Sequence, residues 1–237
     1  MMFRKLFLIP IFCIIGIFSA YQREAFAFFT TKSERPLPTR IRWKMAVNGI
    51  DQYAPIMMRF FKEESIAEIW KQNRKGRFVL VAYYGICKWS GGLGPKYKEG
   101  DYQTPEGFYT VRANQMNPRS QYYLSFNIGF PNSYDRAHNR TGSYIMVHGG
   151  CSSVGCYAMS DKNMAQIYAF ARDALRGGQK EFYVHSFPFR MTDANMDRYR
   201  TYPHYPFWMM LKEGYDFFEK HHIPPEVDVR EKRYVFS

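Results

Sequence analysis

The chain has 237 residues, of which 46% are hydrophobic and 23% are charged, a length that suits one domain with a sizeable buried core. Its 33 basic and 21 acidic residues give a net charge of +12, which favours an anionic neighbour. The sequence contains no nucleic-acid-binding motif, concentrated basic helix, internal repeat or low-complexity block. We therefore expect a globular protein without a nucleic-acid partner.

Residues 1–27 have the pattern of a secretory signal peptide. Arg4 and Lys5 supply the positive start, Leu6 to Phe18 the apolar core, and Ala25-Phe26-Ala27 the cleavage site. As a helix the apolar core spans only about 20 Å, less than the roughly 30 Å hydrocarbon layer of a bilayer. We predict export to the periplasm and no stable membrane span after cleavage, so the anionic neighbours would be cell-wall polymer or lipid headgroups.

A lead-in segment, residues 28–52, is expected to be part loop and part short helix. It carries the densest basic cluster, Arg40-x-Arg42-x-Lys44, for which a solvated face is the default interpretation. After it, apolar and β-branched runs separated by hairpin-length breaks predict an antiparallel meander of three strands. These strands are Ile56 to Lys62, Ile66 to Gln72 and Arg77 to Cys87.

The rest of the chain predicts four more strands and three helices. The strands are Phe108 to Val111, Tyr122 to Ile128, Ser143 to Val147 and Glu181 to Ser186. A helix over 161–176 is predicted by an apolar stripe between Ser160 as N-cap and Gly177-Gly178 as stop. Helices over 193–200 and 207–221 are expected to pack over the sheet, and the tail from Pro224 is expected to add one edge strand or to lie loose.

The glycine-rich loop from Gly91 to Gly100 lacks the Lys-Ser/Thr pair of a phosphate-binding P-loop. It runs to Thr104-Pro105-Glu106-Gly107, which we interpret as a turn that feeds a strand, so Glu106 is not predicted to be an acid catalyst. His138 and His185 are also left out of the catalytic set, because a lone histidine is more often a satisfied surface or core group.

The most informative stretch joins a histidine to a cysteine. His148 ends an apolar run, and Ser153-x-Gly155-Cys156 follows it. A thiol attacks a carbonyl as the thiolate and needs a neighbouring base, so we predict Cys156 as nucleophile and His148 as its base. Gly155 leaves room for a substrate, and the amides of Gly155 and Cys156 are candidates to bind an oxyanion. Tyr144 would share the face of His148 on a regular strand and line either the substrate groove or the core.

Two other interpretations of these residues stay open. Cys151 and Cys156 are close enough in sequence to form a disulfide, and His148, Cys151 and Cys156 could bind zinc with His185 as fourth ligand. After removal of the signal peptide three cysteines remain, an odd number, so at least one thiol stays free in an oxidising compartment. Spacing does not decide whether Cys87 pairs with Cys151.

Four ordered motifs in roughly residues 53–220 resemble the L,D-transpeptidase catalytic domain of YkuD type, and more narrowly its YafK-like branch. The motifs are Trp89 to Lys96, Gly100 to Tyr109, Asn127 to Arg140, and His148-Gly149 followed by Ser153-x-Gly155-Cys156. The resemblance implies an α+β, mainly β fold: a twisted mixed sheet or sandwich with a helix after the catalytic cysteine and C-terminal helices packed on it. It places the catalytic domain at 53–190 and a C-terminal helical extension and tail at 191–237.

The resemblance also implies a reaction. Cys156 would take an acyl group from a peptidoglycan stem peptide, His148 would be the base, and the carbonyl of Gly149 would orient the imidazole. Gly155 and Cys156 match the oxyanion-binding turn, and we assign Ser153 and Tyr144 to substrate binding. No cofactor and no metal are expected.

The motif departs from the wider family, which has a longer insertion after the His-Gly pair. Val154 stands where the family has a second histidine, and Ala158 stands where it commonly has arginine. Some members of the YafK-like branch resemble hydrolases that detach a lipoprotein from peptidoglycan. Transpeptidation and hydrolysis therefore both stay open, with a wall-attached lipoprotein as a possible further partner, and a non-catalytic wall-binding domain is the third alternative.

Overall fold

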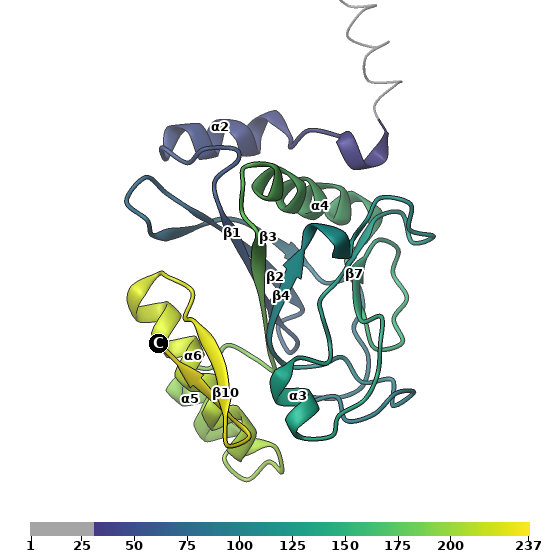
Figure 1. The fold of residues 1–237 in the computed structure, drawn as a ribbon, viewed down its shortest axis with the longest axis vertical. Coiled ribbons are helices and arrows are strands. Elements are labelled where there is room, and N and C mark those ends of the chain that lie inside the picture. The colour runs from purple at the N-terminus through teal and green to yellow at the C-terminus, as the bar shows by residue number, and fades with distance from the viewer. Residues whose placement is uncertain (1–30) are drawn as a thin grey trace, which may run out of the picture.

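The computed structural model describes residues 31–237, so the predicted signal peptide, residues 1–27, lies outside the described part of the chain. Its centre is a mixed five-stranded sheet in the order β3-β2-β1-β9-β4 (Figure 1). β1 and β9 run parallel, and the other neighbouring strands run antiparallel. The strands are β1 (Ile56–Phe61), β2 (Ile66–Gln72), β3 (Phe78–Gly85), β4 (Gly107–Arg112) and β9 (Glu181–Phe187). The predicted meander of β1, β2 and β3 is confirmed.

The middle strand of the central sheet, β1, is buried on both faces. All six side chains of β1 are buried, and alternate residues contribute to different core clusters, Ile56 and Phe60 to one and Phe61 to another. Side chains alternate across a strand, so β1 has a packed layer on each side. The predicted α+β, mainly β fold class is confirmed.

One layer holds a four-stranded sheet in the order β5-β6-β7-β8 together with helix α4 (Asp161–Arg176). Its strands are β5 (Met116–Asn117), β6 (Ser125–Asn127), β7 (Met146–His148) and β8 (Tyr157–Ala158), and the short helices η2 (Ala113–Gln115) and α3 (Ser133–Ala137) lie in the connections. As predicted, α4 begins after Ser160, whose hydroxyl accepts a hydrogen bond from the Asn163 amide, and ends before Gly177. The apolar side of α4 packs into the main core.

Two predicted strands are shorter than the sequence pattern suggests. Tyr122 to Ile128 yields only β6, and Ser143 to Val147 yields only the end that becomes β7. Tyr123 and Tyr144 adopt left-handed backbone conformations, with φ of 68° and 53°, which interrupt an extended strand. Tyr144 therefore does not share the face of His148 through strand alternation, and that part of the prediction is wrong.

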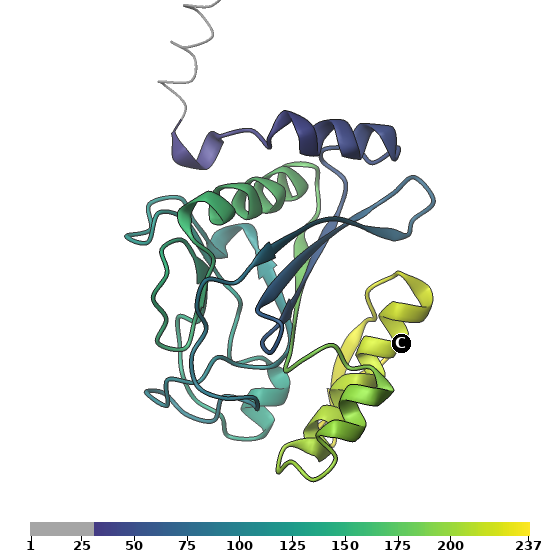
Figure 2. The same cartoon turned by 180° about the vertical axis from the view of Figure 1, so that it is seen from behind.

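The other layer is C-terminal. Helices α5 (Asp193–Arg198) and α6 (Tyr205–His221) cover the sheet face opposite α4, as Figures 1 and 2 show. The tail forms a hairpin of β10 (Val227–Arg230) and β11 (Arg233–Phe236) that packs on α6, so the expectation of one edge strand or a loose tail is wrong. Its two-residue turn places Glu231 and Lys232 at positive φ without the Asn-Gly pair that normally predicts such a turn.

The lead-in segment contains η1 (Lys32–Glu34) and α2 (Thr39–Val47), which lie outside α4 at one end of the molecule (Figure 2). Leu37, Met45 and Ile50 are buried and join the main core. Glu34 pairs with Arg176 of α4 through two hydrogen bonds of 2.8 Å. Between residues 31 and 237, no helix is long and apolar enough to cross a membrane.

A buried ion pair fixes the glycine-rich loop to the sheet. Lys62 and Glu106 are fully buried, with Nζ 2.9 Å from Oε1. Lys62 also donates to the carbonyls of Gly92 and Gly94, and Glu106 accepts from the Gly94 amide and from the Trp208 indole. Burial lowers the pKa of Lys62, and Glu106 opposes that shift. The Glu106 carboxylate thus bonds Lys62, the glycine-rich loop and Trp208 of α6.

We predict that Glu106→Gln lowers the free energy of unfolding by about 3 to 5 kcal/mol, because it leaves the Lys62 ammonium buried without a counter-charge. Urea unfolding measures this loss. The matched control is Glu34→Gln, which breaks the exposed pair with Arg176 and should cost less than about 1 kcal/mol. Equal small losses in the two variants would contradict the importance of the buried pair.

Candidate active site

Cys156 lies one residue before β8 and is half-buried. Its Sγ accepts a hydrogen bond from the Met146 amide at 3.3 Å, and its S–H is directed at the Tyr144 carbonyl 3.8 Å away. Among the described residues, Cys156 is the one cysteine outside a disulfide. The thiol is therefore held by the backbone that leads into β7.

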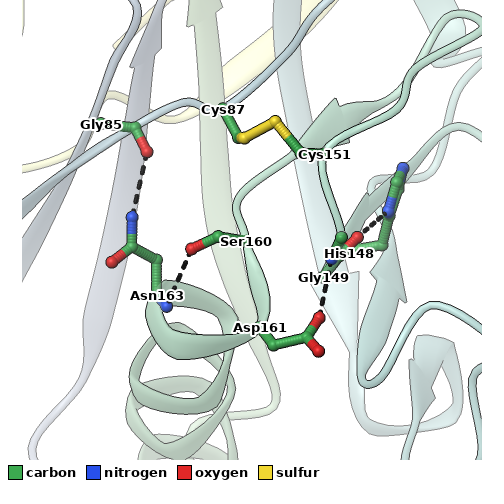
Figure 3. The surroundings of a disulfide bond; sticks show 9 residues. Gly85, Cys87, His148, Gly149, Cys151, Ser160, Asp161 and Asn163 are labelled. Atoms are coloured by element: carbon green, nitrogen blue, oxygen red, sulfur yellow. Dashed lines mark hydrogen bonds between the residues drawn. A yellow bond between two sulfur atoms is a disulfide. The ribbon is translucent and has the colours of Figure 1, made fainter.

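The other two described cysteines, Cys87 and Cys151, form a disulfide across 64 residues (Figure 3). The bond ties the loop between His148 and Cys156 to the segment that follows β3. A Cys151–Cys156 disulfide is thereby excluded, and so is a zinc site that needs the Cys151 thiolate. His185, the fourth ligand of that hypothetical site, is fully buried in β9 against Phe108.

His148 ends β7, next to β8 in parallel register with Val147 opposite Tyr157. Its Nδ1 lies 2.5 Å from the carbonyl oxygen of Gly149, a hydrogen bond drawn in Figure 3. A carbonyl only accepts, so Nδ1 carries the hydrogen and Nε2 carries the lone pair that a general base needs. The ring of Tyr122 lies 4.9 Å from the imidazole, centre to centre.

The register relates the base to the thiol. When the β7–β8 register is extended by one residue toward the start of both strands, Cys156 lies opposite Met146. The hydrogen bond from the Met146 amide to Sγ of Cys156 is consistent with this pairing. Residues two apart on a strand share a face, so His148 and Cys156 emerge from neighbouring strands on one face of the small sheet. Within residues 31–237 the two side chains are not hydrogen-bonded to each other: the imidazole binds the Gly149 carbonyl, and the thiol contacts the Met146 amide and the Tyr144 carbonyl.

Burial favours neutral forms of both groups. It raises the pKa of the Cys156 thiol, and the Met146 amide and the positive charge of Lys96 oppose this to a smaller extent. Burial also lowers the pKa of His148, and the Gly149 carbonyl opposes that shift. Both shifts favour the uncharged thiol and the uncharged imidazole over their charged forms.

The turn before Cys156 is closed by serine hydroxyls. The Gly155 amide donates to Ser90 Oγ at 2.5 Å, and the Cys156 amide donates to Ser153 Oγ at 3.0 Å. Ser153 donates in turn to the Cys156 carbonyl at 2.7 Å, and the two serine oxygens lie 3.2 Å apart. Both amides that the sequence suggested for an oxyanion thus have hydroxyl partners in this structure.

Thr104 links this turn to the loop that Glu106 anchors. Its hydroxyl accepts from the Ser90 amide at 3.0 Å and donates to the Cys156 carbonyl at 3.2 Å. Sequence reasoning gave no role to Ser90 or Thr104, although both lie in the motifs that carry the resemblance. Position in those motifs was the only signal, because the contacts to Gly155 and Cys156 span 65 and 52 residues. We call Ser90, Thr104 and Ser153 the hydroxyl clasp.

Gly149 has no room for a side chain. A Cβ there would lie 2.6 Å from Asp161 Oδ1 and 2.7 Å from the Tyr122 carbonyl oxygen. The Gly149 amide donates to that carbonyl, and the neighbouring Gly150 amide donates to Asp161. Asp161 starts α4, so the helix helps to fix the carbonyl that holds His148 (Figure 3).

Tyr144 lies next to the thiol through its backbone, while its side chain is 77% exposed. A place in the core, one of the two roles considered for it, is therefore excluded. The exposed ring is free to meet a substrate at the surface beside Cys156.

Comparison with known proteins identifies the family. Residues 63–177 match the sequence profile of the L,D-transpeptidase catalytic domain (YkuD). YafK of Escherichia coli (strain K12), which is named for the L,D-transpeptidases, is 44% identical over 213 residues, or 90% of this chain and 85% of YafK. The chain belongs to the L,D-transpeptidase family. The resemblance drawn from the four motifs, including the YafK-like branch, is confirmed.

Two solved structures align with this L,D-transpeptidase family member over most of its length. The helical cell shape determining protein Pgp2 of Campylobacter jejuni has a TM-score of 0.45 and 17% identity, covering 81% of this chain and 80% of Pgp2. Bd1075 of Bdellovibrio bacteriovorus has a TM-score of 0.41 and 17% identity, covering 76% and 78% of the two chains.

Hydrogen bonds join the four family motifs to one another. Ser90 of the first contacts Thr104 of the second and Gly155 of the fourth. The third is joined to the second by Asn132, which donates to the Phe108 carbonyl at 2.8 Å. The spacing of the motifs along this L,D-transpeptidase family chain is thus explained by their contacts in the fold.

We predict that Cys156 is alkylated slowly at neutral pH and that the rate rises with an inflection above the range of an ordinary thiol, about 8.5. Burial of the thiol is the reason, because only the thiolate reacts. The measurement is the pH dependence of iodoacetamide labelling, with the urea-unfolded protein as the control that titrates normally. Lys96→Met should move the inflection further up. An inflection well below neutral pH would instead indicate a preformed thiolate and imidazolium.

Proposed function

We propose that the protein is an exported cysteine acyl-transfer enzyme that acts on peptidoglycan stem peptides. The observation that carries this proposal is the unpaired Cys156 thiol beside an imidazole whose Nδ1 is fixed by the Gly149 carbonyl, in a chain of the L,D-transpeptidase family. The signal-peptide pattern of residues 1–27 supports a periplasmic location.

The reaction starts from the neutral pair. As Sγ of Cys156 attacks the amide carbonyl of the stem peptide, its proton moves to Nε2 of His148. The carbon–nitrogen bond then breaks, His148 returns the proton to the leaving amine, and the acyl group remains on Cys156 as a thioester. Gly149 acts throughout, because its carbonyl holds the imidazole and stabilises the transient imidazolium.

The amides of Gly155 and Cys156 supply the oxyanion site in this proposal. Ser90 and Ser153 hold the Gly155 and Cys156 amides in place until the substrate carbonyl oxygen displaces the serine oxygens. Amide donors that are already aimed at the developing negative charge lower the barrier to its formation. Gly155 has a φ of 109°, which a residue with a side chain rarely adopts, so this turn depends on glycine.

The thioester is then resolved by an amine, which makes a crosslink, or by water. The second outcome, hydrolysis, is favoured by one observation: Val154, which stands where the wider family has histidine, is exposed and offers no hydrogen bond to an acceptor amine. Under this alternative the bond cut is that between a stem peptide and a neighbouring residue or a wall-attached lipoprotein.

We predict that purified protein incubated with sacculi forms an acyl adduct on Cys156 and changes the pattern of wall fragments. Mass spectrometry detects both, and a new crosslink differs in mass from a released peptide or protein. Cys156→Ala should abolish the adduct and the product, with a loss of at least about a thousandfold in rate, because the nucleophile is gone.

The matched control is Cys87→Ser combined with Cys151→Ser, which removes the two other described sulfurs and keeps Cys156. This variant should still form the adduct. Full turnover by Cys156→Ala would overturn the proposed chemistry. Binding of the wild type to sacculi without any adduct or product would support the non-catalytic wall-binding alternative instead.

A further inference from the structure

The outward face of α2 has an unusual composition for a solvated helix. Ile41 and Met45 turn inward and pack with Leu37 against the main core. On the outside, Trp43 is 67% exposed and Val47, one turn later, is 64% exposed. The helix therefore has apolar side chains on its outer side as well as on its inner side.

Three cations flank these apolar residues. Arg40, Arg42 and Lys44 are exposed, and the sequence of α2 contains no acidic residue. In the part of the chain from residue 31 onward, none of the three pairs with a carboxylate: Arg42 contacts the Thr39 hydroxyl, and Lys44 contacts the Val81 carbonyl. Their positive charge is thus not neutralised within the described protein.

A groove of about 600 Å³ runs between α2 and β3. Its lining includes Trp43 and Lys44 from α2 and Tyr83 from β3, whose side chain is 70% exposed. Tryptophan and tyrosine beside arginine and lysine are the residues that settle at the boundary between lipid headgroups and acyl chains. The cations are complementary to anionic lipid headgroups, and the aromatic side chains of the groove are suited to the acyl chains below them.

The place of α2 in the molecule fits the same partner. Figures 1 and 2 show α2 along the outer edge at one end, beside the start of the described chain and far from the C-terminal hairpin. In the sequence, the apolar run Leu6 to Phe18 precedes α2 by about twenty residues, a linker that reaches at most roughly 70 Å. If the run Leu6 to Phe18 enters a bilayer before the signal peptide is cleaved, this linker keeps α2 close to the lipid headgroups.

We propose that the outward face of α2, together with Tyr83, rests on an anionic phospholipid surface. We call this surface, formed by Arg40, Arg42, Trp43, Lys44, Val47 and Tyr83, the α2 face. The inference rests on the proposed export of the protein, but it does not depend on the chemistry of Cys156. Its consequence is an enzyme held at the membrane side of the wall by a surface contact.

The test is sedimentation of the mature protein, residues 28–237, with vesicles of phosphatidylglycerol and phosphatidylcholine or of phosphatidylcholine alone. Binding is expected only with the anionic lipid and should fall as salt is added. Replacing Arg40, Arg42 and Lys44 together with glutamine should weaken the partition by on the order of a hundredfold, since each cation near the surface is worth about a factor of five. Trp43→Ala should weaken it further.

The matched control replaces Arg230, Lys232 and Arg233 of the distant C-terminal hairpin with glutamine, the same change in charge, and should bind like the wild type. Cys156→Ala should also bind like the wild type, which separates this proposal from failure of the proposed reaction. No binding to anionic vesicles, equal loss in both triple variants, or α2-dependent binding to purified sacculi in place of vesicles would each overturn the proposal.

Discussion

The Lys62–Glu106 pair is the interaction on which the geometry of the site depends. A charge buried without a partner is strongly unfavourable, so Lys62 just after β1 and Glu106 just before β4 hold each other in place. Their remaining hydrogen bonds go to the backbone of the glycine-rich loop and to Trp208 of α6. The central sheet, the loop and the C-terminal layer are thereby joined at one point.

The glycine-rich loop connects the buried ion pair to the turn before Cys156. Ser90 precedes the anchored glycines, and its hydroxyl and amide contact Gly155 and Thr104. The Cys87–Cys151 disulfide joins the same stretch of chain to the loop between His148 and Cys156. Two connections, one polar and one covalent, therefore hold the turn before Cys156, and the base is held separately by Gly149 and Asp161. The short, local sequence around the cysteine is not sufficient by itself to shape this turn.

The sequence predicted those elements whose formation depends on residues close together in the chain. The alternation in β1 to β3, and Ser160 with Gly177 around α4, are readable because strand period and helix caps depend on neighbouring residues. The His148 and Cys156 pair was readable because only seven residues separate them. The C-terminal hairpin was missed because its turn uses Glu231 and Lys232 at positive φ instead of glycine or asparagine.

The rest of the site depends on contacts that one sequence does not display. The pairing of Cys87 with Cys151 and the clasp on Gly155 join segments more than sixty residues apart. Burial raises the pKa of Cys156 and lowers the pKa of His148, and the motif does not show that burial. Ser90, Gly155, Cys156 and His148 lie in the four motifs, and the fold shows which residues they contact.

Hydrogen exchange of the Glu106→Gln protein tests most directly whether the buried pair orders the catalytic turn. The account predicts that peptides covering residues 90–95 and 153–156 lose protection together, while peptides from the middle of α4 keep theirs. Unchanged protection of residues 153–156 in a folded variant that has lost protection at 90–95 would contradict it.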